Sequence, residues 1–288
     1  MNFTKLQGAG NDFVLVETSD RQRDWSRVAR AICDRHFGVG GDGLLLVLPS
    51  DVADFQMSVF NPDGSKAEAC GNGLRCLAKY VMDMGLANSG AQGILVETIS
   101  GVRRAKLHRA MSNVATIQVG MGEPRFGARD IPVMVETGGG NLVDIKPILD
   151  YPVTVNGEGL PMSFVSIGNP HAVYFCPHSI SDFPLSRIGP EVEQHWLFPN
   201  RVNFEVARVI NRQQIEARVW ERGVGETQAC GSGACAVAVL AQLNGYVDNR
   251  VDIKLPGGIL EVDWSGAGEV FLSGPAEIVF IGEWADEV

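Results

Sequence analysis

The chain opens as an alternation of short apolar runs and turn residues. Apolar runs predict strands over residues 13–16, 44–48 and 55–60. Asp24 is a typical N-cap residue, and apolar positions recur at helical spacing over residues 25–36. The pattern therefore predicts short strands around one short helix in this part of the chain.

A second helix is predicted to begin at residue 71 and to end near Gly85. Its apolar and polar positions fall on different faces: Leu74, Leu77, Val81 and Met82 on one, and Arg75, Lys79 and Asp83 on the other. This division predicts a helix that packs through one face only. Further strands are predicted over residues 94–99, 102–108 and 114–119, and the Gly/Pro-rich residues 120–124 mark a domain junction.

The second half of the chain repeats the order of the first. Its predicted elements are a strand over 172–175, a helix over 185–196, strands over 202–210 and 215–220, a polar turn over 221–223, a helix from 231, and closing strands over 251–255, 259–264, 270–272 and 276–281. Asn61 and Glu221 each lie nine residues before a cysteine, so the order recurs at a period near 160 residues. Such a period is too long for a solenoid and indicates a duplicated domain. The helix from residue 231 is apolar nearly all round, which predicts central burial.

Each half carries a cysteine directly before a Gly-x-Gly turn and a predicted helix. The two motifs read Ala69-Cys70-Gly71-Asn72-Gly73-Leu74-Arg75-Cys76 and Ala229-Cys230-Gly231-Ser232-Gly233-Ala234-Cys235. A helix N-terminus presents free N–H groups and the positive end of a dipole, roughly half a charge in size. We expect this position to shift the pKa of a thiol below the ~8.5 of free cysteine and to hold a carboxylate.

Two such thiols fit the inversion of a stereocentre beside a carboxylate. The reaction needs a base on one face of the carbon and an acid on the other, and one thiolate with one thiol supplies both. The helix N-termini would stabilise the charge that develops as the proton leaves. Two alternatives stay open: a cysteine is often a small buried residue, and two facing thiols could form a reversible disulfide in a redox sensor. The cysteines predicted to be structural are Cys33, Cys76, Cys176 and Cys235.

Composition and charge narrow the classes of function. A length of 288 residues allows two domains, and 45% hydrophobic with 20% charged residues is typical of a globular soluble protein. The net charge of −10, without a Lys/Arg cluster, argues against a nucleic-acid partner. No apolar run reaches about 20 residues and no export signal is recognised, so we expect a cytoplasmic protein without a membrane partner. The size of the chain and the lack of a recognised export signal argue against a disulfide framework for its six cysteines. The spacings from Cys70 to Cys76 and from Cys230 to Cys235 do not match a structural zinc site, so no metal is expected.

Together, these motifs resemble those of the diaminopimelate epimerase family. The resemblance covers nearly the whole chain and rests on residues 8–13, 60–64, 69–76, 168–171, 201–204, 221–223 and 229–233. It implies an isomerase that works without pyridoxal phosphate or any other cofactor. Its reaction would convert LL-2,6-diaminopimelate to meso-2,6-diaminopimelate in lysine and peptidoglycan-precursor biosynthesis.

The resemblance also implies an α+β fold of two pseudo-symmetric domains. Each would be a curved, mainly antiparallel sheet or barrel around a central helix, with the active site in the cleft between the two. We expect an N-terminal epimerase domain of residues 1–117 plus 275–288, which carries the Cys70 helix. The C-terminal epimerase domain would comprise residues 118–274 and carry the Cys230 helix.

Site residues follow from the resemblance position by position. Cys70 and Cys230 would be the acid/base pair, and His171 and Glu221 would tune the pKa values of the thiols. The residues expected to bind the small diamino diacid are Asn11, Asn61, Gly71, Asn72, Asn169, Asn203, Glu221, Arg222, Gly231 and Ser232. Physically, Arg222 offers a fork to a carboxylate, whereas Glu221 can balance an ammonium.

The chain departs from the family at one binding position. Gly43 stands where some members carry a glutamine ligand, so no side-chain contact is expected there. The glycine-rich residues 38–43 are not expected to bind phosphate, because no Lys-Ser/Thr follows them. The nearest alternatives are an amino-acid racemase and an isomerase of the phenazine-biosynthesis type, which lacks the cysteine pair. Twofold dimers are the commonest assemblies of soluble proteins, so a homodimer stays open as the assembly of this chain.

Overall fold

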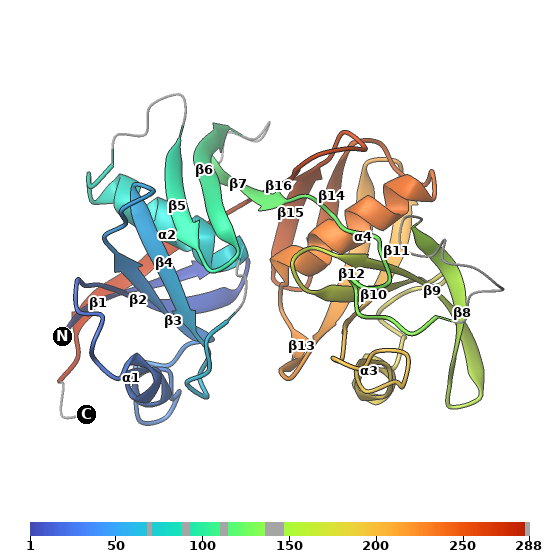
Figure 1. Cartoon of the computed structure of the whole chain (residues 1–288), viewed down its shortest axis with the longest axis horizontal. Coiled ribbons are helices and arrows are strands. Elements are labelled where there is room, and N and C mark those ends of the chain that lie inside the picture. Colours follow the sequence, from blue (N-terminus) through green and yellow to red (C-terminus); the bar gives the residue numbers. More distant parts are fainter. Residues whose placement is uncertain (68–70, 88–92, 110–114, 136–146, 286–288) are drawn as a thin grey trace. The chain divides into compact units, whose positions relative to one another are not determined.

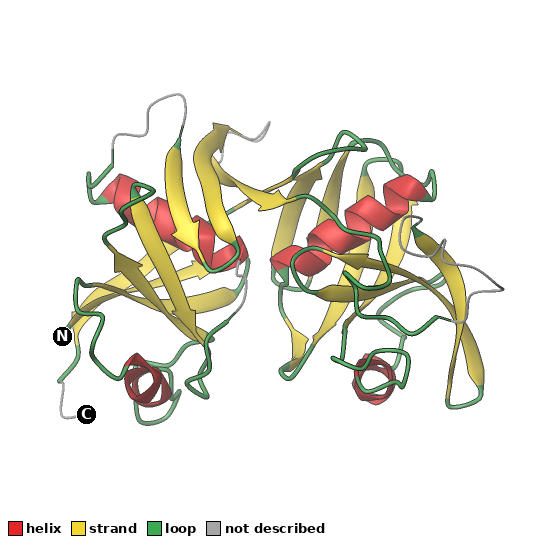
Figure 2. Cartoon of the chain, viewed as in Figure 1, coloured by secondary structure: helices red, strands yellow, loops and turns green. Residues whose placement is uncertain are grey.

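The computed structural model describes residues 1–67, 71–87, 93–109, 115–135 and 147–285. In these ranges the chain forms four α-helices and seventeen β-strands, and the predicted α+β class is confirmed (Figures 1 and 2). Two compact units are present: Met1–Gly120 with Ser273–Val288, and Met121–Leu272. Among the helices described, none has both the length and the apolar character needed to span a membrane.

The first unit is a curved sheet with a helix against its concave side (Figure 1). Its strands pair in the order β17 (Glu277–Glu283), β1 (Asn2–Gly8), β2 (Asn11–Glu17), β3 (Gly43–Leu48), β4 (Phe55–Phe60), β5 (Ile94–Thr98), β6 (Gly101–Arg109) and β7 (Ala115–Gly122). The β2–β3 and β4–β5 pairs are parallel, so each needs a crossover. Helix α1 (Trp25–Ile32) supplies the first and α2 (Gly71–Asp83) the second, and α2 contacts six of the strands.

The second unit has the same plan. Its elements are β8 (Ile148–Val155), β9 (Glu158–Ser166), β10 (Pro170–Phe175), α3 (Leu185–Glu193), β11 (Asn203–Asn211), β12 (Gln214–Glu221), β13 (Gly225–Thr227), α4 (Gly231–Leu243), β14 (Arg250–Leu255), β15 (Gly258–Asp263) and β16 (Val270–Gly274). The β10–β11 and β12–β14 pairs are parallel, with α3 and α4 as crossovers. The pairs β8–β9, β9–β10, β11–β12, β12–β13 and β14–β15 are antiparallel.

The register of the parallel strands makes the two units comparable residue by residue. Phe13 of β2 pairs with Gly43 of β3, and His171 of β10 pairs with Asn203 of β11. Each pair lies at the start of its parallel ladder. Phe13 comes two positions after Asn11, and His171 comes two positions after Asn169. The equivalent helices α2 and α4 both have 13 residues and both begin directly after a cysteine. The duplication predicted from the spacing of motifs is therefore present in the strand order and register.

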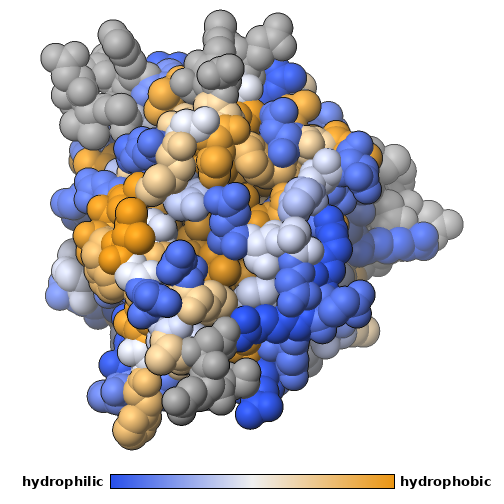
Figure 3. Space-filling model, turned by 90° about the vertical axis from the view of Figure 1, so that its left-hand side faces the viewer, coloured by the Kyte–Doolittle hydropathy of each residue, from blue (hydrophilic) through white to orange (hydrophobic). Residues whose placement is uncertain are grey.

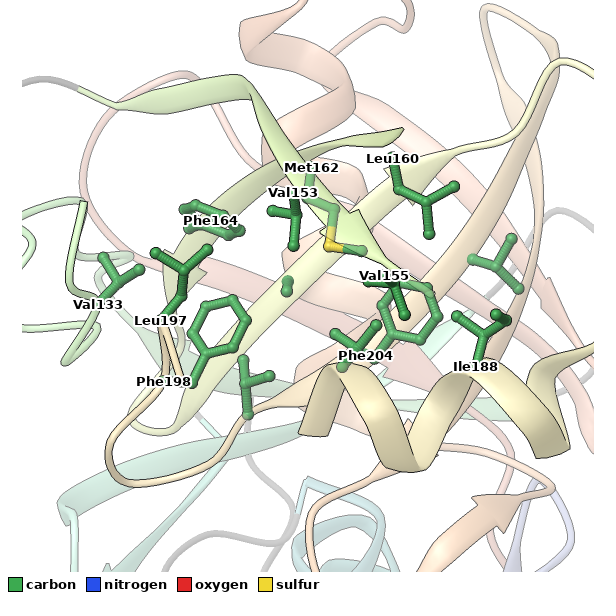
Figure 4. Packing of buried hydrophobic residues seen from close by; sticks show 14 of the residues in the cluster. Val133, Val153, Val155, Leu160, Met162, Phe164, Ile188, Leu197, Phe198 and Phe204 are labelled. Carbon is green, nitrogen blue, oxygen red and sulfur yellow. The ribbon is translucent and has the colours of Figure 1, made fainter. Parts of the chain in front are cut away.

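Burial of apolar side chains explains why the crossover helices form. Figure 4 shows Ile188 of α3 packed toward Phe204 of β11, with Met162 and Phe164 of β9 in the same cluster. An equivalent cluster lies between α1 and its sheet in the first unit. Helix α4 is buried from its first residue through residue 241, which confirms the prediction from its all-round apolar sequence. Asp24 caps α1 as predicted, by accepting from the backbone N–H of Arg27.

Two helices end earlier than predicted. Helix α1 stops at Ile32, because the carboxylate of Asp34 accepts from the backbone N–H groups of His36 and Phe37 and forms a turn. Helix α3 stops at Glu193, shortly after Pro190. Strands β1, β8, β9 and β13 were not among the predicted elements. In β1 the apolar pattern is broken because the polar residues Thr4 and Lys5 are buried.

The prediction that α2 packs through one face only is wrong. Arg75, assigned to the polar face, is 0% exposed, and the helix is buried on all sides from its first residue through Ala78. The side chain of Arg75 donates to Asn72 Oδ1 and, through Nε, to the backbone oxygen of Pro275. Burial of this guanidinium is possible because polar partners surround it, and helical spacing does not reveal them.

Candidate active site

Cys230 occupies the N-cap position of α4. Its backbone is extended, and its Sγ accepts a hydrogen bond from the backbone N–H of Gly233 at 3.3 Å. The hydroxyl of Ser232 lies 3.4 Å from the same sulfur, and the residue is 6% exposed. A cysteine thus takes the place that Ser, Thr, Asp or Asn usually fills at a helix start. The other cysteine motif lies partly outside the described residues, since these do not include 68–70 and therefore not Cys70.

The expectation that the helix start lowers the pKa of this thiol is wrong for Cys230. Burial raises the pKa of Cys230 well above its usual range, and the nearby carboxyl groups of Glu221 and Glu205 raise it further. The hydrogen bonds from Ser232 and Gly233 act in the opposite direction but are the smaller effects. Without substrate, Cys230 is therefore a protonated thiol at neutral pH.

The Glu221–Gly223 turn lies at the end of β12 and is fixed by three other side chains. The hydroxyl of Thr227 donates to Glu221 Oε1 at 2.5 Å, and the backbone N–H of Arg222 donates to Asn203 Oδ1 at 2.9 Å. The backbone N–H of Gly223 donates to the buried Glu193. Burial raises the pKa of Glu221, the charge of Glu205 adds to this, and the bond from Thr227 opposes it.

The predicted binding residues of the second unit lie in one connected group. Asn203 Nδ2 donates to the backbone oxygen of Pro170 at 3.0 Å, so β10 and β11 are joined at their starts. His171 is 0% exposed, with Nδ1 2.7 Å from Glu205 Oε1 and Nε2 2.9 Å from Asn169 Oδ1. The pKa of Glu221 is affected by electrostatic interactions with His171 and Glu205. The pKa of Cys230 is affected in the same way by Glu205 and Glu221.

In the first unit, two of the predicted binding residues are hydrogen-bonded to each other. Asn72 Nδ2 donates to Asn11 Oδ1 at 3.1 Å, and Asn11 Nδ2 donates to Asp42 Oδ2 at 2.8 Å. Arg75 donates to Asn72 Oδ1 at 2.7 Å and so begins the series. Asn61 lies apart from it, in its own turn, where its Nδ2 donates to Ser65 Oγ at 2.9 Å.

A cluster of charges anchors the loop that carries Asp42. Arg35 bridges Asp12 and Asp42 at 2.6 and 2.8 Å, while the buried Lys5 contacts Asp12 and the backbone oxygen of Gly40. Although burial alone would raise it, hydrogen bonds from Arg35 and Lys5 lower the pKa of Asp12 to about 2. The glycine-rich loop is thus tied down by side chains of its own unit.

Among the residues that sequence reasoning did not identify are Asp42, Arg75 and Glu205. Arg75 stands inside a cysteine motif, and Glu205 is the one acidic residue of an otherwise mostly apolar strand, which is the signal that could have found it. Within the described ranges, no group of three or more His, Cys, Asp or Glu is arranged to hold a metal ion.

Comparison with known proteins gives consistent matches along the sequence. The sequence model of the diaminopimelate epimerase family matches residues 3–127 and 163–279. The chain is 45% identical over 287 residues to a diaminopimelate epimerase of Moorella thermoacetica, with 99% of each chain covered. It is 46% identical over 286 residues to that of Desulfovibrio desulfuricans, covering 99% of this chain and 98% of the relative.

Solved structures with much lower identity share the fold. A phenazine biosynthesis protein of the PhzF family from Bacillus anthracis matches with a TM-score of 0.71 at 17% identity, and 99% of each chain is covered. A hydroxyproline epimerase from Agrobacterium vitis matches with a TM-score of 0.70 at 14% identity, covering 98% of this chain and 91% of that one. At these identities the likeness concerns the fold alone.

Proposed function

The chain belongs to the diaminopimelate epimerase family, and we propose that it is an isomerase that converts LL-2,6-diaminopimelate to the meso form with the thiols of Cys70 and Cys230. The observation that carries this proposal is the position of Cys230 at the N-cap of α4, with the N–H of Gly233 on its sulfur. The duplicated order of elements supports an equivalent position for Cys70 before α2. The two units are proposed to be the two epimerase domains.

In the proposed reaction, a thiolate removes the α-proton from one face of the carbon and a thiol delivers a proton to the other. The carbanion between these steps is stabilised as its charge moves onto the α-carboxylate, which the N–H groups at a helix start can hold. No electrons are gained or lost, and each thiol ends in the state in which the other began. The raised pKa of Cys230 supports its role as the proton donor when substrate first arrives, with Cys70 as the base.

We propose that the remaining predicted residues recognise the two charged ends of the substrate. The backbone N–H groups at residues 71–72 and 231–232 suit the carboxylate at the reacting centre. Arg222 suits the distant carboxylate, because its guanidinium can offer two parallel donors. The asparagines proposed to orient the substrate by hydrogen bonds are Asn11, Asn61, Asn72, Asn169 and Asn203. As a biosynthetic enzyme of this family, the protein is proposed to be cytoplasmic.

Incorporation of solvent deuterium tests the reaction. Reduced protein is incubated with LL-diaminopimelate in D₂O, and the α-hydrogens are followed by NMR. Deuterium at one centre together with meso product is expected for the wild type, and no epimerisation for Cys70→Ala or Cys230→Ala. Cys235→Ala is the matched control, since Cys235 lies inside α4 at 0% exposure and is expected to leave turnover unchanged. Absence of exchange with any diamino diacid by folded, reduced protein would reject the proposal.

A homodimer formed through β17 is proposed as the assembly. Val279, Phe280 and Ile281 are 56%, 47% and 63% exposed, although they are apolar and follow one another in a strand. Figure 3 shows hydrophobic residues gathered on the side of the first unit that it presents. A contiguous exposed apolar surface promotes association, and twofold dimers are the commonest assemblies. Light scattering should give a dimer for the wild type and a monomer for Ile281→Glu, with Val52→Glu as the exposed control; a monomeric wild type would contradict this.

A further inference from the structure

The carboxyl group of Glu193 joins three segments of the second unit. Glu193 is the last residue of α3 and is 5% exposed. Its Oε2 accepts from the indole N–H of Trp220 at 2.8 Å, and its Oε1 accepts from the backbone N–H of Gly223 at 2.9 Å. Arg201 Nη1 lies 3.4 Å from the same Oε1. Glutamate is rarely buried without partners, so these contacts explain how α3 can end on one.

The direction of these hydrogen bonds follows from the donors. An indole N–H and a backbone N–H can only donate, so both oxygens of Glu193 act as acceptors. A glutamine in this place would have one acceptor oxygen, and its NH₂ group would face one of the two donors. A methionine would have no oxygen to offer either of them. The position therefore requires two acceptors side by side, which a carboxyl group provides.

Helix α3 packs directly against the hairpin that carries the Glu221–Gly223 turn. It contacts β12 and β13, the two strands of that hairpin (Figure 1). The approach is close at Gly189, where a Cβ would lie 2.5 Å from the indole ring of Trp220. Gly189 and Glu193 are four positions apart and so share one face of the helix. Through this face, α3 holds the indole ring with Gly189 and its N–H with Glu193.

The turn itself is exposed to solvent and is fixed by hydrogen bonds. Gly223 has φ +75°, in the left-handed region that favours glycine, and it is exposed. The residue before it, Arg222, is held by its N–H on Asn203 Oδ1 and by its guanidinium, which donates to the backbone oxygen of Asn200 at 3.1 Å. The bond from Gly223 to Glu193 ties the same turn to α3.

We propose that Glu193 is a positioning residue that holds the Glu221–Gly223 turn so that Arg222 meets the distant carboxylate of the substrate. It acts on the backbone of the turn directly, through the N–H of the residue after Arg222. It also contacts Arg201, the neighbour of Asn200, and the backbone oxygen of Asn200 accepts from the guanidinium of Arg222. The part that concerns substrate rests on the proposed function above.

The corresponding turn of the first unit is held in a different way. It spans residues 61–64 and comes after β4, as the turn over residues 221–224 comes at the end of β12. The crossover helix α1 contacts it through Arg30, whose Nη1 donates to the backbone oxygen of Asp63 at 3.4 Å. The helix therefore donates to its turn in the first unit and accepts from it in the second. The turn at 61–64 is thus an internal control for changes at Glu193.

Hydrogen exchange of the protein without substrate, followed by NMR, tests the contact. Gly223 is exposed, so the protection of its N–H depends on its hydrogen bond. In Glu193→Met, we expect exchange at residues 222–224 to be about tenfold faster than in the wild type, with no change at 61–64. Glu191→Met, which changes an exposed glutamate of the same helix, should leave both turns unchanged. Wild-type exchange at 222–224 in Glu193→Met would overturn the proposal.

A second set of variants separates acceptance of the hydrogen bond from packing. Trp220→Phe removes the indole donor, so the NH₂ group of a glutamine at position 193 no longer faces an N–H and its oxygen can accept from Gly223. In the Trp220→Phe background, Glu193→Gln should leave exchange at 222–224 unchanged, whereas Glu193→Met should make it about tenfold faster. Equal effects of the two substitutions would mean that Glu193 acts by packing and would overturn the proposal. If Glu193→Met does not fold, Glu193→Asp withdraws the carboxyl group by one methylene and should also make exchange faster.

Kinetics tests the consequence for substrate binding. Glu193→Met should raise KM for LL-diaminopimelate about tenfold with a smaller change in kcat, because the turn is proposed to bind the end of the substrate that does not react. Glu191→Met should leave both constants unchanged. Faster exchange at 222–224 with an unchanged KM would overturn the link to Arg222. A wild type without activity on any diamino diacid would reject the proposed function, whereas hydrogen exchange would still decide whether Glu193 holds the turn.

Discussion

The guanidinium of Arg75 donates to the side-chain oxygen of Asn72 at 2.7 Å, and this bond fixes the orientation of two asparagine amides. Arginine only donates, so Asn72 must present its oxygen to Arg75 and its NH₂ to Asn11. Asn11 must then receive with its oxygen and donate to the carboxylate of Asp42. A buried cation at one end and an anion at the other leave a single arrangement for the amides between them.

Replacement of Arg75 by methionine should therefore disturb both stability and substrate binding. The change removes the guanidinium donor from Asn72 Oδ1 and from the backbone oxygen of Pro275, at a cost of about 2–4 kcal/mol in the free energy of unfolding. KM should rise more than kcat falls, because the amides of Asn72 and Asn11 lose their fixed orientation. Urea unfolding and steady-state kinetics measure both, with the exposed Arg27→Met as control. A stable Arg75→Met variant with normal KM would refute this role.

The charge cluster at Asp12 should make the protein sensitive to acid. Hydrogen bonds from Arg35 and Lys5 lower the pKa of Asp12 to about 2, below its value in the unfolded chain, although burial opposes this. A carboxyl group with a pKa lowered by folding stabilises the protein above its unfolded pKa, and this contribution is lost as the pH falls toward the folded pKa. Asp12→Asn should cost about 1–2 kcal/mol at pH 7 and progressively less between about pH 4 and pH 2. The exposed Asp51→Asn should cost little, and a pH-independent loss in Asp12→Asn would contradict the assignment.

The duplicated plan could be predicted from the sequence because each of its signals is local. Apolar runs, the N-cap of α1 and the cysteine motifs before α2 and α4 each depend on neighbours within a few positions. Their recurrence at one period was enough to pair the two halves of the chain. Strand β1 was missed for a related reason, since its buried Lys5 interrupts the apolar pattern and is stabilised by Asp12 and by Gly40, 35 residues away.

The polar residues behind the candidate site could not be predicted in the same way. Arg75 has helical spacing typical of a solvent-facing residue, and its burial depends on Pro275, 200 positions further along. Glu205 depends likewise on His171, 34 positions earlier. The pKa of Cys230 was misjudged because the helix start was considered alone, whereas burial and two carboxyl groups have the larger effect. Long-range partners of this kind appear only once the strands are placed.

The raised pKa of Cys230 predicts a loss of stability at alkaline pH. Burial and the nearby Glu221 and Glu205 raise the pKa of this thiol in the folded protein. A group with a pKa raised by folding contributes its stability fully below the unfolded pKa and loses it as the pH rises toward the folded value. From about pH 8.5 upward, the wild type should therefore lose about 1 kcal/mol per pH unit relative to Cys230→Ala. Urea unfolding across this range measures the difference between the two proteins. If the stabilities of the wild type and of Cys230→Ala changed equally with pH, the pKa of Cys230 would not be raised by folding.

The start of α4 leaves no room for a side chain at Gly233. A Cβ there would lie 2.8 Å from Glu205 Oε1 and 3.3 Å from the Cβ of Cys230, although alanine normally favours a helix over glycine. Gly233→Ala should therefore lower the free energy of unfolding by about 1–3 kcal/mol and reduce turnover, because Cys230 and Glu205 must move apart. Gly159→Ala, where a Cβ meets open space, is the control. Since Glu205 supplies the closest clash, Glu205→Ala should make the further cost of Gly233→Ala smaller, and a double-mutant cycle measures this coupling. Additive effects of the two substitutions would mean that Glu205 and Gly233 are not in contact in solution.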